Sequence, residues 1–487
     1  MPEIETDSES HVTAPEDRIP LDQKSAYAVG MLVNNLQAAA LPAMMVILNL
    51  GLKMRAEWVG IIAFAPRIID AVTDPMMGYI SDHTRTRWGR RRPYIFAGAI
   101  LAGLIFAAMW QLPEGHSEQF YFWVFLSVSF LYFVAYTIYA TPFVALGFEM
   151  TPDYHERTRL QAFANTVGQL AWIGVPWFYA IMASDRFENT VHGARVLALW
   201  VGGTICLLGL FPAVFCREPK TMGGVEPVKD ATQANATGIV ANLMDFFQGL
   251  VTTFNCKPFV KICAATFLVF NGFQLGASFS LYVIQYYLYA GNEKSAGILQ
   301  GKFGTLTALC TLAVIPLTAW ISTKIGKRNT FLITISLSLF GYAIKWFGYN
   351  PDHPEWLLFS CPFVAFGTGS LFTLMGSMVA DVCDYDELES HERREGVFGA
   401  IYWWMVKVGM ALAGLLTGYM LLWSNFDVNL ETAQPDQTLF LLRVFDVGVP
   451  LATSALALFI MFTYELTETR SHEIRAELVA RRGKLDD

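Results

Sequence analysis

The chain has 487 residues, of which 54% are hydrophobic and only 16% are charged. Soluble proteins carry about 25% charged residues, so this composition excludes an ordinary water-soluble protein and indicates a membrane protein. The formal net charge of −8 argues against a nucleic-acid partner, because phosphate binding needs a basic surface.

A spanning helix needs about 20 mostly apolar residues, because the hydrocarbon core of a bilayer is about 30 Å thick. Scanning the chain for such runs predicts an all-α polytopic membrane protein with twelve transmembrane helices. In chain order the runs cover 25–50, 57–81, 93–112, 119–148, 160–184, 194–216, 258–290, 300–323, 329–349, 355–381, 397–423 and 438–464.

The longest polar interruption divides these runs into two six-helix halves. It holds apolar residues at helical spacing between Ile239 and Phe254. That stripe predicts either an interfacial amphipathic helix or a short helix packed on the ends of its neighbours. The expected organisation is an N-terminal tail, a first half, a linker, a second half and a C-terminal tail, at 1–24, 25–216, 217–257, 258–464 and 465–487.

Lysine and arginine are distributed unevenly among the short loops. Alternate loops hold the basic segments 85–92, 157–159, 217–220, 324–328 and 393–394, whereas the opposite loops hold only isolated basic residues. Because positive loops stay in the cytoplasm, both termini and the linker are expected inside. With no cleavable signal peptide visible, the predicted location is the plasma (inner) membrane.

The two halves also resemble each other. Gly78–Arg92 follows the second run and the shorter basic turn Ser322–Arg328 follows the eighth. Asp153–Arg157 follows the fourth run, and the acidic and basic residues of Asp384–Arg393 follow the tenth. Turns of one kind at matching places indicate parallel repeats, which is the plan of the major facilitator fold, with a substrate cavity between the halves.

Ionisable residues inside apolar helices are costly and by default mark a functional site. Asp70 and Asp74 are four residues apart in the second run, so they share one helix face. Their repulsion is relieved by a cation or a proton, and their oxygens suit Na⁺. The alternative is a structural ion pair with Arg67 or another basic group. Pro75 predicts a kink or a freed backbone carbonyl one turn earlier.

Lys407 is a single cation within the apolar eleventh run. The natural partner of its ammonium group is the Asp70/Asp74 pair, which would link the two halves electrostatically. The alternative is that the side chain snorkels to the membrane interface.

The segment from Asp70 to Gly78, followed by Asp82–Pro93, resembles the signature of the glycoside–pentoside–hexuronide:cation symporter family. Weaker supporting matches are Tyr136-Thr-Ile, Pro142-Phe143, His155-Glu-Arg157-Thr-Arg159, Ala380-Asp381, Asp384-Tyr385 and Lys407. The resemblance covers the whole membrane region. It implies a secondary active symporter that imports a sugar-type solute with Na⁺ or H⁺ by alternating access.

The resemblance also implies roles for single residues. The expected cation site, where Na⁺ is the candidate metal, consists of Asp70, Thr73, Asp74 and Thr137. Lys407 and Arg67 are its expected electrostatic neighbours. The expected cytoplasmic gate consists of Asp82, Arg87, Arg91, Arg157, Arg159, Asp381 and Asp384.

The sequence differs from the family members that transport melibiose at the positions of their sugar-binding residues. Their acidic sugar-binding residues align with Asn35 and Ala140, and a basic residue aligns with Asn165. Galactoside specificity is therefore not carried over. The candidate cavity residues are the amides and aromatics Asn34, Asn35, Tyr139, Asn165, Trp172, Tyr402 and Trp403. Such a lining suits a sugar, and it equally suits an amphipathic non-sugar solute such as a lipid-like molecule or a cyclic organic acid.

Two other classes of protein are less compatible with the sequence. An intramembrane enzyme needs a catalytic motif, and neither HExxH nor a nucleophile elbow is present. A channel does not need the two-half plan with a carboxylate pair on one side. No enzymatic activity and no cofactor besides the coupling ion are expected. The expected partners are the solute, the cation and the lipid bilayer, and the expected state is a monomer.

Overall fold

The computed structural model describes residues 17–151, 153–218, 253–391 and 394–483, together with Met244 and Gly249. Within these residues every regular element is a helix. The helix predicted between Ile239 and Phe254 falls mainly outside the described residues, so it stays a prediction.

The first half consists of six helical segments, some of them interrupted. They are α1 (Leu21–Met44) with α2 (Val46–Leu50), α3 (Ala56–His83), α4 (Arg92–Met109), α5 (Glu118–Glu149), α6 (Tyr154–Gly174) with η1 (Val175–Trp177) and α7 (Phe178–Met182), and α8 (Thr190–Phe215).

The second half repeats this plan. Its segments are α10 (Lys257–Tyr282) with η2 (Val283–Leu288), α11 (Glu293–Ile325), α12 (Lys327–Gly348), η3 (Pro354–Ser360) with α13 (Cys361–Ser390), α14 (Glu395–Trp423), and α15 (Asp436–Arg443) with η5 (Val444–Gly448) and α16 (Val449–Phe462). The short turn η4 (Val428–Leu430) precedes α15, and α17 (Glu468–Gly483) ends the described chain.

Each predicted run coincides with one of these segments, although the ends differ by several residues. Ten of the segments are long and apolar enough to cross a membrane. The other two, α3 and the α6–α7 segment, lie in the same bundle, but α3 carries the acidic cluster and α6 begins with charged residues. The count of twelve spans therefore stays a prediction.

Polar caps and special residues set several helix ends. The side chains of Asp153, Asn189 and Asn292 accept hydrogen bonds from the backbone three residues later, at 2.6, 2.7 and 2.9 Å. These bonds satisfy N–H groups that have no partner within the helix. Gly326 separates α11 from α12 with a φ of +80°, a conformation that L side chains rarely adopt.

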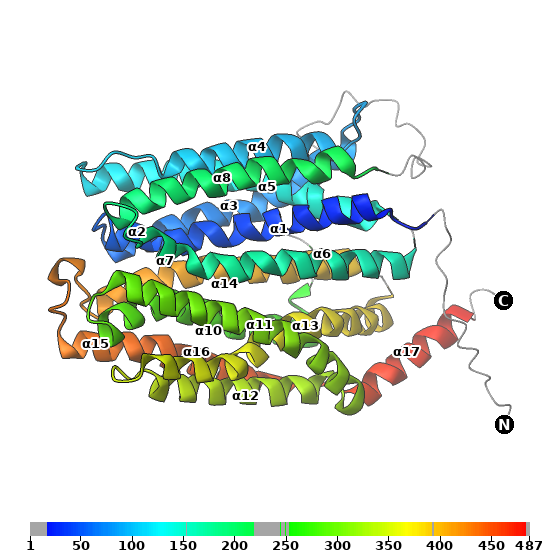
Figure 1. Cartoon of the computed structure of the whole chain (residues 1–487). Coiled ribbons are helices and arrows are strands. Elements are labelled where there is room, and N and C mark those ends of the chain that lie inside the picture. The colour runs from blue at the N-terminus through cyan, green and yellow to red at the C-terminus, as the bar shows by residue number, and fades with distance from the viewer. Residues whose placement is uncertain are drawn as a thin grey trace.

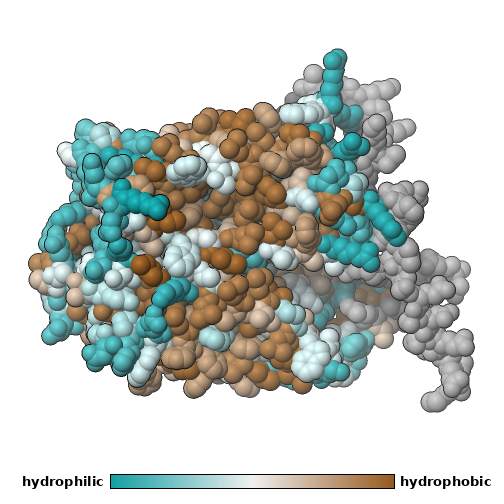
Figure 2. Space-filling model, viewed as in Figure 1, coloured by the Kyte–Doolittle hydropathy of each residue, from teal (hydrophilic) through white to brown (hydrophobic). Residues whose placement is uncertain are grey.

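The helices run side by side, with the first half above the second in Figure 1. We call the end where α2, α7 and α15 lie the α2 end, and the opposite end, where α1 begins and α17 lies, the α17 end. Figure 2 shows a hydrophobic band around the middle of the molecule with hydrophilic residues at both ends. This is the surface expected of a protein that crosses a bilayer.

The two halves pack against each other mainly at the α2 end. One hydrophobic core contains the buried side chains of the first half together with Leu275, Phe279 and Phe303 of the second. A separate core, which includes Phe259 and Phe398, belongs to the second half alone and lies toward the α17 end. Among the described residues, the core shared by the two halves thus lies toward the α2 end.

The helix α17 was missed by the sequence analysis, which assigned 465–487 only as a tail. It packs against α13 and buries Ile474 and Leu478. At the same place Arg481 contacts His391, with 2.7 Å between Nη1 and Nδ1. The segment is too polar to be found by a search for membrane spans.

Candidate functional site

The first predicted site residues lie on α3, which remains helical through Pro75. Asp74 is held from α5: Thr137 donates a hydrogen bond of 3.0 Å to its Oδ1, and Thr141 donates one of 3.4 Å. Thr73 donates to the Ile69 carbonyl at 3.1 Å, and its hydroxyl lies 3.4 Å from that of Thr137. Carboxylate and hydroxyl oxygens from α3 and α5 thus meet at one point.

Lys407 on α14 reaches the same point from the other half. Its ammonium group forms an ion pair with the second oxygen of Asp74, Oδ2. The Lys407 side chain remains 32% exposed, so the pair is open on one side. The structure therefore brings Asp74, Thr73, Thr137 and Lys407 together across the boundary between the halves.

Asp70 differs from Asp74 in its surroundings. It is 1% exposed, and both of its carboxylate oxygens are buried without a hydrogen-bond partner among the described residues. A buried carboxylate without partners is costly, so such a group is expected to bind a proton, a cation or water.

Arg67 lies one turn from Asp70 but points elsewhere. Its guanidinium contacts the Ala38 carbonyl at 3.5 Å and Met410 Sδ at 3.7 Å, and it lies 4.9 Å from the Phe133 ring centre. Among the described residues Arg67 therefore forms no ion pair with either carboxylate. The alternative of an ion pair with another basic group is found for one of the two, because Lys407 pairs with Asp74.

Polar contacts close the α2 end between the halves. Trp177 donates to Thr305 Oγ1 at 2.8 Å, and Tyr179 donates to Gln285 Oε1 at 2.8 Å. Further contacts across the halves are Thr190 to Glu293 at 2.7 Å, Tyr282 to Asn49 at 3.1 Å, and the ion pair of Lys294 with Asp185. We call this set the α2-end seam.

Glycines in α11 let the halves approach closely along this seam. A Cβ atom added to Gly301 would lie 2.6 Å from the Trp177 ring, and one on Gly304 would lie 2.4 Å from Pro176. On the other side of the bundle, Gly418 of α14 packs against the Ala56 carbonyl of α3, with 2.4 Å to an added Cβ. At Gly301 and Gly304 the helix backbone thus lies directly against the side chains of Trp177 and Pro176, an approach that larger residues would prevent.

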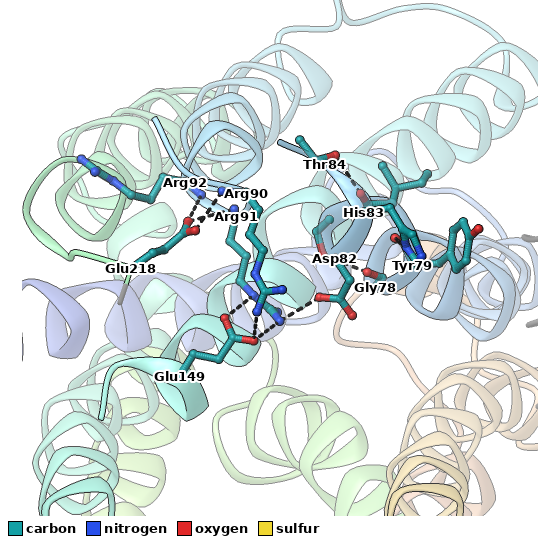
Figure 3. A network of polar contacts seen from close by, with 12 residues as sticks. Gly78, Tyr79, Asp82, His83, Thr84, Arg90, Arg91, Arg92, Glu149 and Glu218 are labelled. Atoms are coloured by element: carbon teal, nitrogen blue, oxygen red, sulfur yellow. Dashed lines mark hydrogen bonds and ion pairs between the residues drawn. The ribbon is translucent and has the colours of Figure 1, made fainter. Parts of the chain in front are cut away.

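A charged network occupies the α17 end of the first half (Figure 3). Arg91 contacts Asp82 at 2.8 Å and Glu149 at 2.5 Å. Glu149 also pairs with Arg90, and this contact raises the pKa of the Arg90 guanidinium. Glu218 accepts the backbone N–H groups of residues 90–92 at 2.8, 2.9 and 3.2 Å, where a carboxylate suits the start of α4.

The other predicted gate residues are also bonded within their own half or exposed. Arg159 lies 3.6 Å from Glu156, and Arg157 donates to the Thr151 carbonyl at 3.1 Å. In the second half Lys327 pairs with Asp381 at 2.7 Å. Arg87 is exposed and Asp384 is half-buried on α13. Their action as a gate across the halves stays a prediction.

The predicted cavity residues separate into two groups. Tyr139 is fully buried, stacks on Phe143 and donates to the Gly30 carbonyl at 3.0 Å. Tyr402 is packed in the core of the second half. The prediction that Tyr139 and Tyr402 line the cavity is therefore corrected. Each ring is buried among the helices of its own half.

The remaining cavity candidates are at least partly accessible. Asn34 and Asn35 are half-buried on α1, and the Asn35 amide lies against Gly168 of α6. Asn165 and Trp172 are exposed on α6, and Trp403 is exposed on α14. An exposed amide within a spanning helix is expected to face water and not lipid.

The sequence analysis missed several residues of these clusters. Thr141 lies four residues after Thr137, so helical spacing would have placed it on the same face. Glu149 lies one residue beyond the predicted run 119–148 and Glu218 lies two residues beyond the run 194–216, so a search for apolar runs includes neither. The seam contacts carry no sequence signal, because they depend on the packing of distant helices.

Three comparisons place this arrangement among known proteins. Residues 26–468 match the model of a family described as MFS/sugar transport protein. An isoprimeverose transporter of Lactiplantibacillus pentosus is 24% identical over 84% of this chain and 81% of its own. A putative glycoside/cation symporter of Escherichia coli (strain K12) is 25% identical over 88% of each chain.

The solved structures that match share the fold. A nucleoside transporter has a TM-score of 0.64 at 12% identity, covering 91% of this chain and 99% of its own. The match to the family model covers nearly all of the described bundle, and it includes both halves and the site between them. The chain belongs to the MFS/sugar transport protein family, and it is a membrane transporter of the major facilitator superfamily.

Proposed function

We propose that the protein is a symporter that couples the import of a glycoside-type sugar to the entry of Na⁺ or H⁺. The observation that carries this proposal is the ion pair between Lys407 of one half and Asp74 of the other, beside the unpartnered carboxylate of Asp70. A single cation that binds these carboxylates acts on both halves, which is what coupling requires.

The oxygens present fit a small hard cation. Asp70, Asp74, Thr73 and Thr137 offer carboxylate and hydroxyl groups, which Na⁺ prefers to nitrogen or sulfur ligands. A proton on Asp70 or Asp74 would remove the same negative charge. The Lys407 ammonium and a bound cation compete for Asp74, so cation entry weakens the contact between the halves there.

The sugar class rests on the relatives and on the accessible side chains. The relatives are named for isoprimeverose and for glycosides. Asn34 and Asn35 supply amides that hydrogen-bond hydroxyl groups, and Trp172 and Trp403 offer exposed rings on which the apolar face of a sugar stacks. An amphipathic non-sugar solute would use the same rings without needing the amides.

The loop charges support an orientation with the α17 end in the cytoplasm of a plasma-membrane protein. The α2-end seam then closes the outer side, and the structure represents a state closed to the outside. Transport requires this seam to open while the residues around Asp82, Arg91 and Asp381 approach across the halves.

A thermal-shift screen of the purified protein tests the proposed function. Ligands that bind only the folded state raise its apparent stability in proportion to occupancy. We expect stabilisation by isoprimeverose or another glycoside that increases when Na⁺ is added or the pH is lowered. Stabilisation by amphipathic acids alone would move the substrate to the non-sugar class, and no cation effect at all would contradict the coupling.

Substitution of Gly301 by alanine tests the seam. The added methyl group would lie 2.6 Å from the Trp177 ring, so the outer side should fail to close fully. We expect Gly301→Ala to lower uptake by at least about tenfold, because a shift of about 1.4 kcal/mol changes a population tenfold. The measurement is uptake together with labelling of a cysteine introduced at Thr305 by an impermeant reagent from outside.

Gly203→Ala is the matched control, because an added Cβ at Gly203 meets nothing within 4 Å. It should leave uptake and labelling unchanged. Normal uptake and unchanged labelling in Gly301→Ala would show that the seam is not the outer gate.

Substitution of Asn35 by alanine tests the cavity. We expect Asn35→Ala to raise the half-saturating sugar concentration by about 10-fold, the effect of losing a well-placed hydrogen bond to a sugar hydroxyl. The half-saturating cation concentration should change less. Both are measured by uptake at varied sugar and cation, and the reverse pattern would remove Asn35 from the cavity.

A further inference from the structure

Gln37 on α1 is a buried amide that the account so far does not use. It is 1% exposed, and neither its Oε1 nor its Nε2 has a hydrogen-bond partner among the described residues. Asp70 of α3 is in the same condition, with both oxygens unpartnered, and Asn34 of α1 has a buried Oδ1 without a partner among the described residues. Buried polar groups are almost always paired, so groups left without a partner indicate a ligand or water beside them.

Several contacts fix Gln37 and Asp70 at the same level of the bundle. Tyr132 of α5 donates to the Gln37 carbonyl at 2.8 Å, and Arg67 of α3 contacts the next carbonyl, that of Ala38, at 3.5 Å. The Arg67 guanidinium also lies over the ring of Phe133. Segments of α1, α3 and α5 therefore meet one turn from the cation site.

Helical spacing gives the direction of these side chains. Leu41, Arg67 and Phe133 line one small cavity between the halves. One turn toward the α17 end, the same helix faces carry Gln37 on α1, Asp70 on α3 and Thr137 on α5. Gln37 and Asp70 therefore lie at one level of the bundle, on helix faces that continue from this cavity.

From this arrangement we propose that Gln37 is a further group of the cation site, whose amide oxygen binds the cation or its water at Asp70. The proposal rests on the proposed function, because it deepens the same site. Lys407 and the threonines serve Asp74 on the accessible side, and Gln37 serves Asp70 on the buried side. An amide carbonyl is a neutral oxygen ligand of the kind that Na⁺ accepts.

The substitution Gln37→Met tests this role, because methionine keeps the length and shape of the side chain without its polar atoms. If Gln37 only fills space, removing an unpaired buried amide leaves stability unchanged or raised. If it serves the cation, the half-saturating Na⁺ concentration for thermal stabilisation rises by about tenfold, as for other supporting groups of metal sites. The pH midpoint of thermal stabilisation is also compared between Gln37→Met and wild type in Na⁺-free buffer. This comparison distinguishes a proton from Na⁺ as the bound cation.

Gln434→Met is the matched control. Gln434 is also buried with an unpartnered Oε1, but it lies in the loop before α15 and donates to the Asp427 carbonyl. We expect Gln434→Met to lower the thermal stability by the same amount at every cation concentration. A wild-type cation midpoint in Gln37→Met would overturn the proposal.

A second variant covers the case in which Gln37→Met does not fold. Gln37→Glu adds a third carboxylate, which should lower the half-saturating Na⁺ concentration or raise the pH midpoint if the side chain faces Asp70. An unchanged midpoint would overturn the proposal. In the same assay Asp74→Asn reports on the proposed function separately, since loss of the cation effect there supports coupling whatever Gln37 does.

Discussion

Asp74→Asn should abolish the dependence of uptake on the coupling cation. The substitution removes the negative charge that Lys407 and a cation share, while the Asn oxygen can still accept from Thr137. We expect cation-stimulated uptake to fall by more than about 100-fold, because even outer-shell groups of metal sites account for about 10- to 100-fold. Initial uptake rates with and without Na⁺, at two pH values, measure this.

The variant should still fold and insert. Its Lys407 loses a partner, but that side chain is 32% exposed and can be solvated. Asp352→Asn, in an exposed turn at the α2 end, is the control for removal of a carboxylate and should keep the wild-type cation dependence. Full cation stimulation in Asp74→Asn would remove the carboxylate pair from the coupling mechanism.

Lys407→Met should separate cation binding from transport. Without the ammonium group, Asp74 has no cationic partner in the empty site, so an added cation meets less competition. We expect the half-saturating cation concentration for thermal stabilisation to fall, while uptake falls at least about tenfold. The empty carrier then has to keep an uncompensated carboxylate inside the membrane while the two halves rearrange, which is costly.

Two variants control for the loss of a lysine. Lys407→Arg keeps the charge and should retain more uptake than Lys407→Met, although its planar group fits the pair differently. Lys302→Met breaks a surface ion pair with Glu355 and should have little effect. If Lys407→Met transports normally, the ion pair with Asp74 is not part of coupling and the snorkelling alternative regains support.

Hydropathy was sufficient to predict most of the fold. The apolar runs coincide with the observed segments because backbone groups in a bilayer must be paired within helices. It missed α17, which is too polar to be found in this way. Predicted runs coincide with α3 and α6, but these two helices are not among the ten that pass a strict test of length and composition. These are also the segments that carry function or lie at an aqueous end.

Part of the site was also predictable from hydropathy. Asp70, Asp74 and Lys407 are conspicuous because charges are rare in apolar runs. Tyr139 and Tyr402 misled the analysis, because an aromatic ring in a spanning helix fills a core as readily as it lines a cavity. Gln37 and the seam glycines could not be found, since their meaning depends on which distant helix lies opposite.

The central claim is tested most directly by sugar accumulation in proteoliposomes under an imposed Na⁺ or H⁺ gradient. The protein is reconstituted, and a glycoside identified by the thermal-shift screen is supplied outside. Wild type should accumulate the sugar above its outside concentration and lose it when an ionophore collapses the gradient, whereas Asp74→Asn should not accumulate it. Equal inside and outside concentrations in both proteins, unaffected by the gradient, would contradict cation-coupled symport through this site.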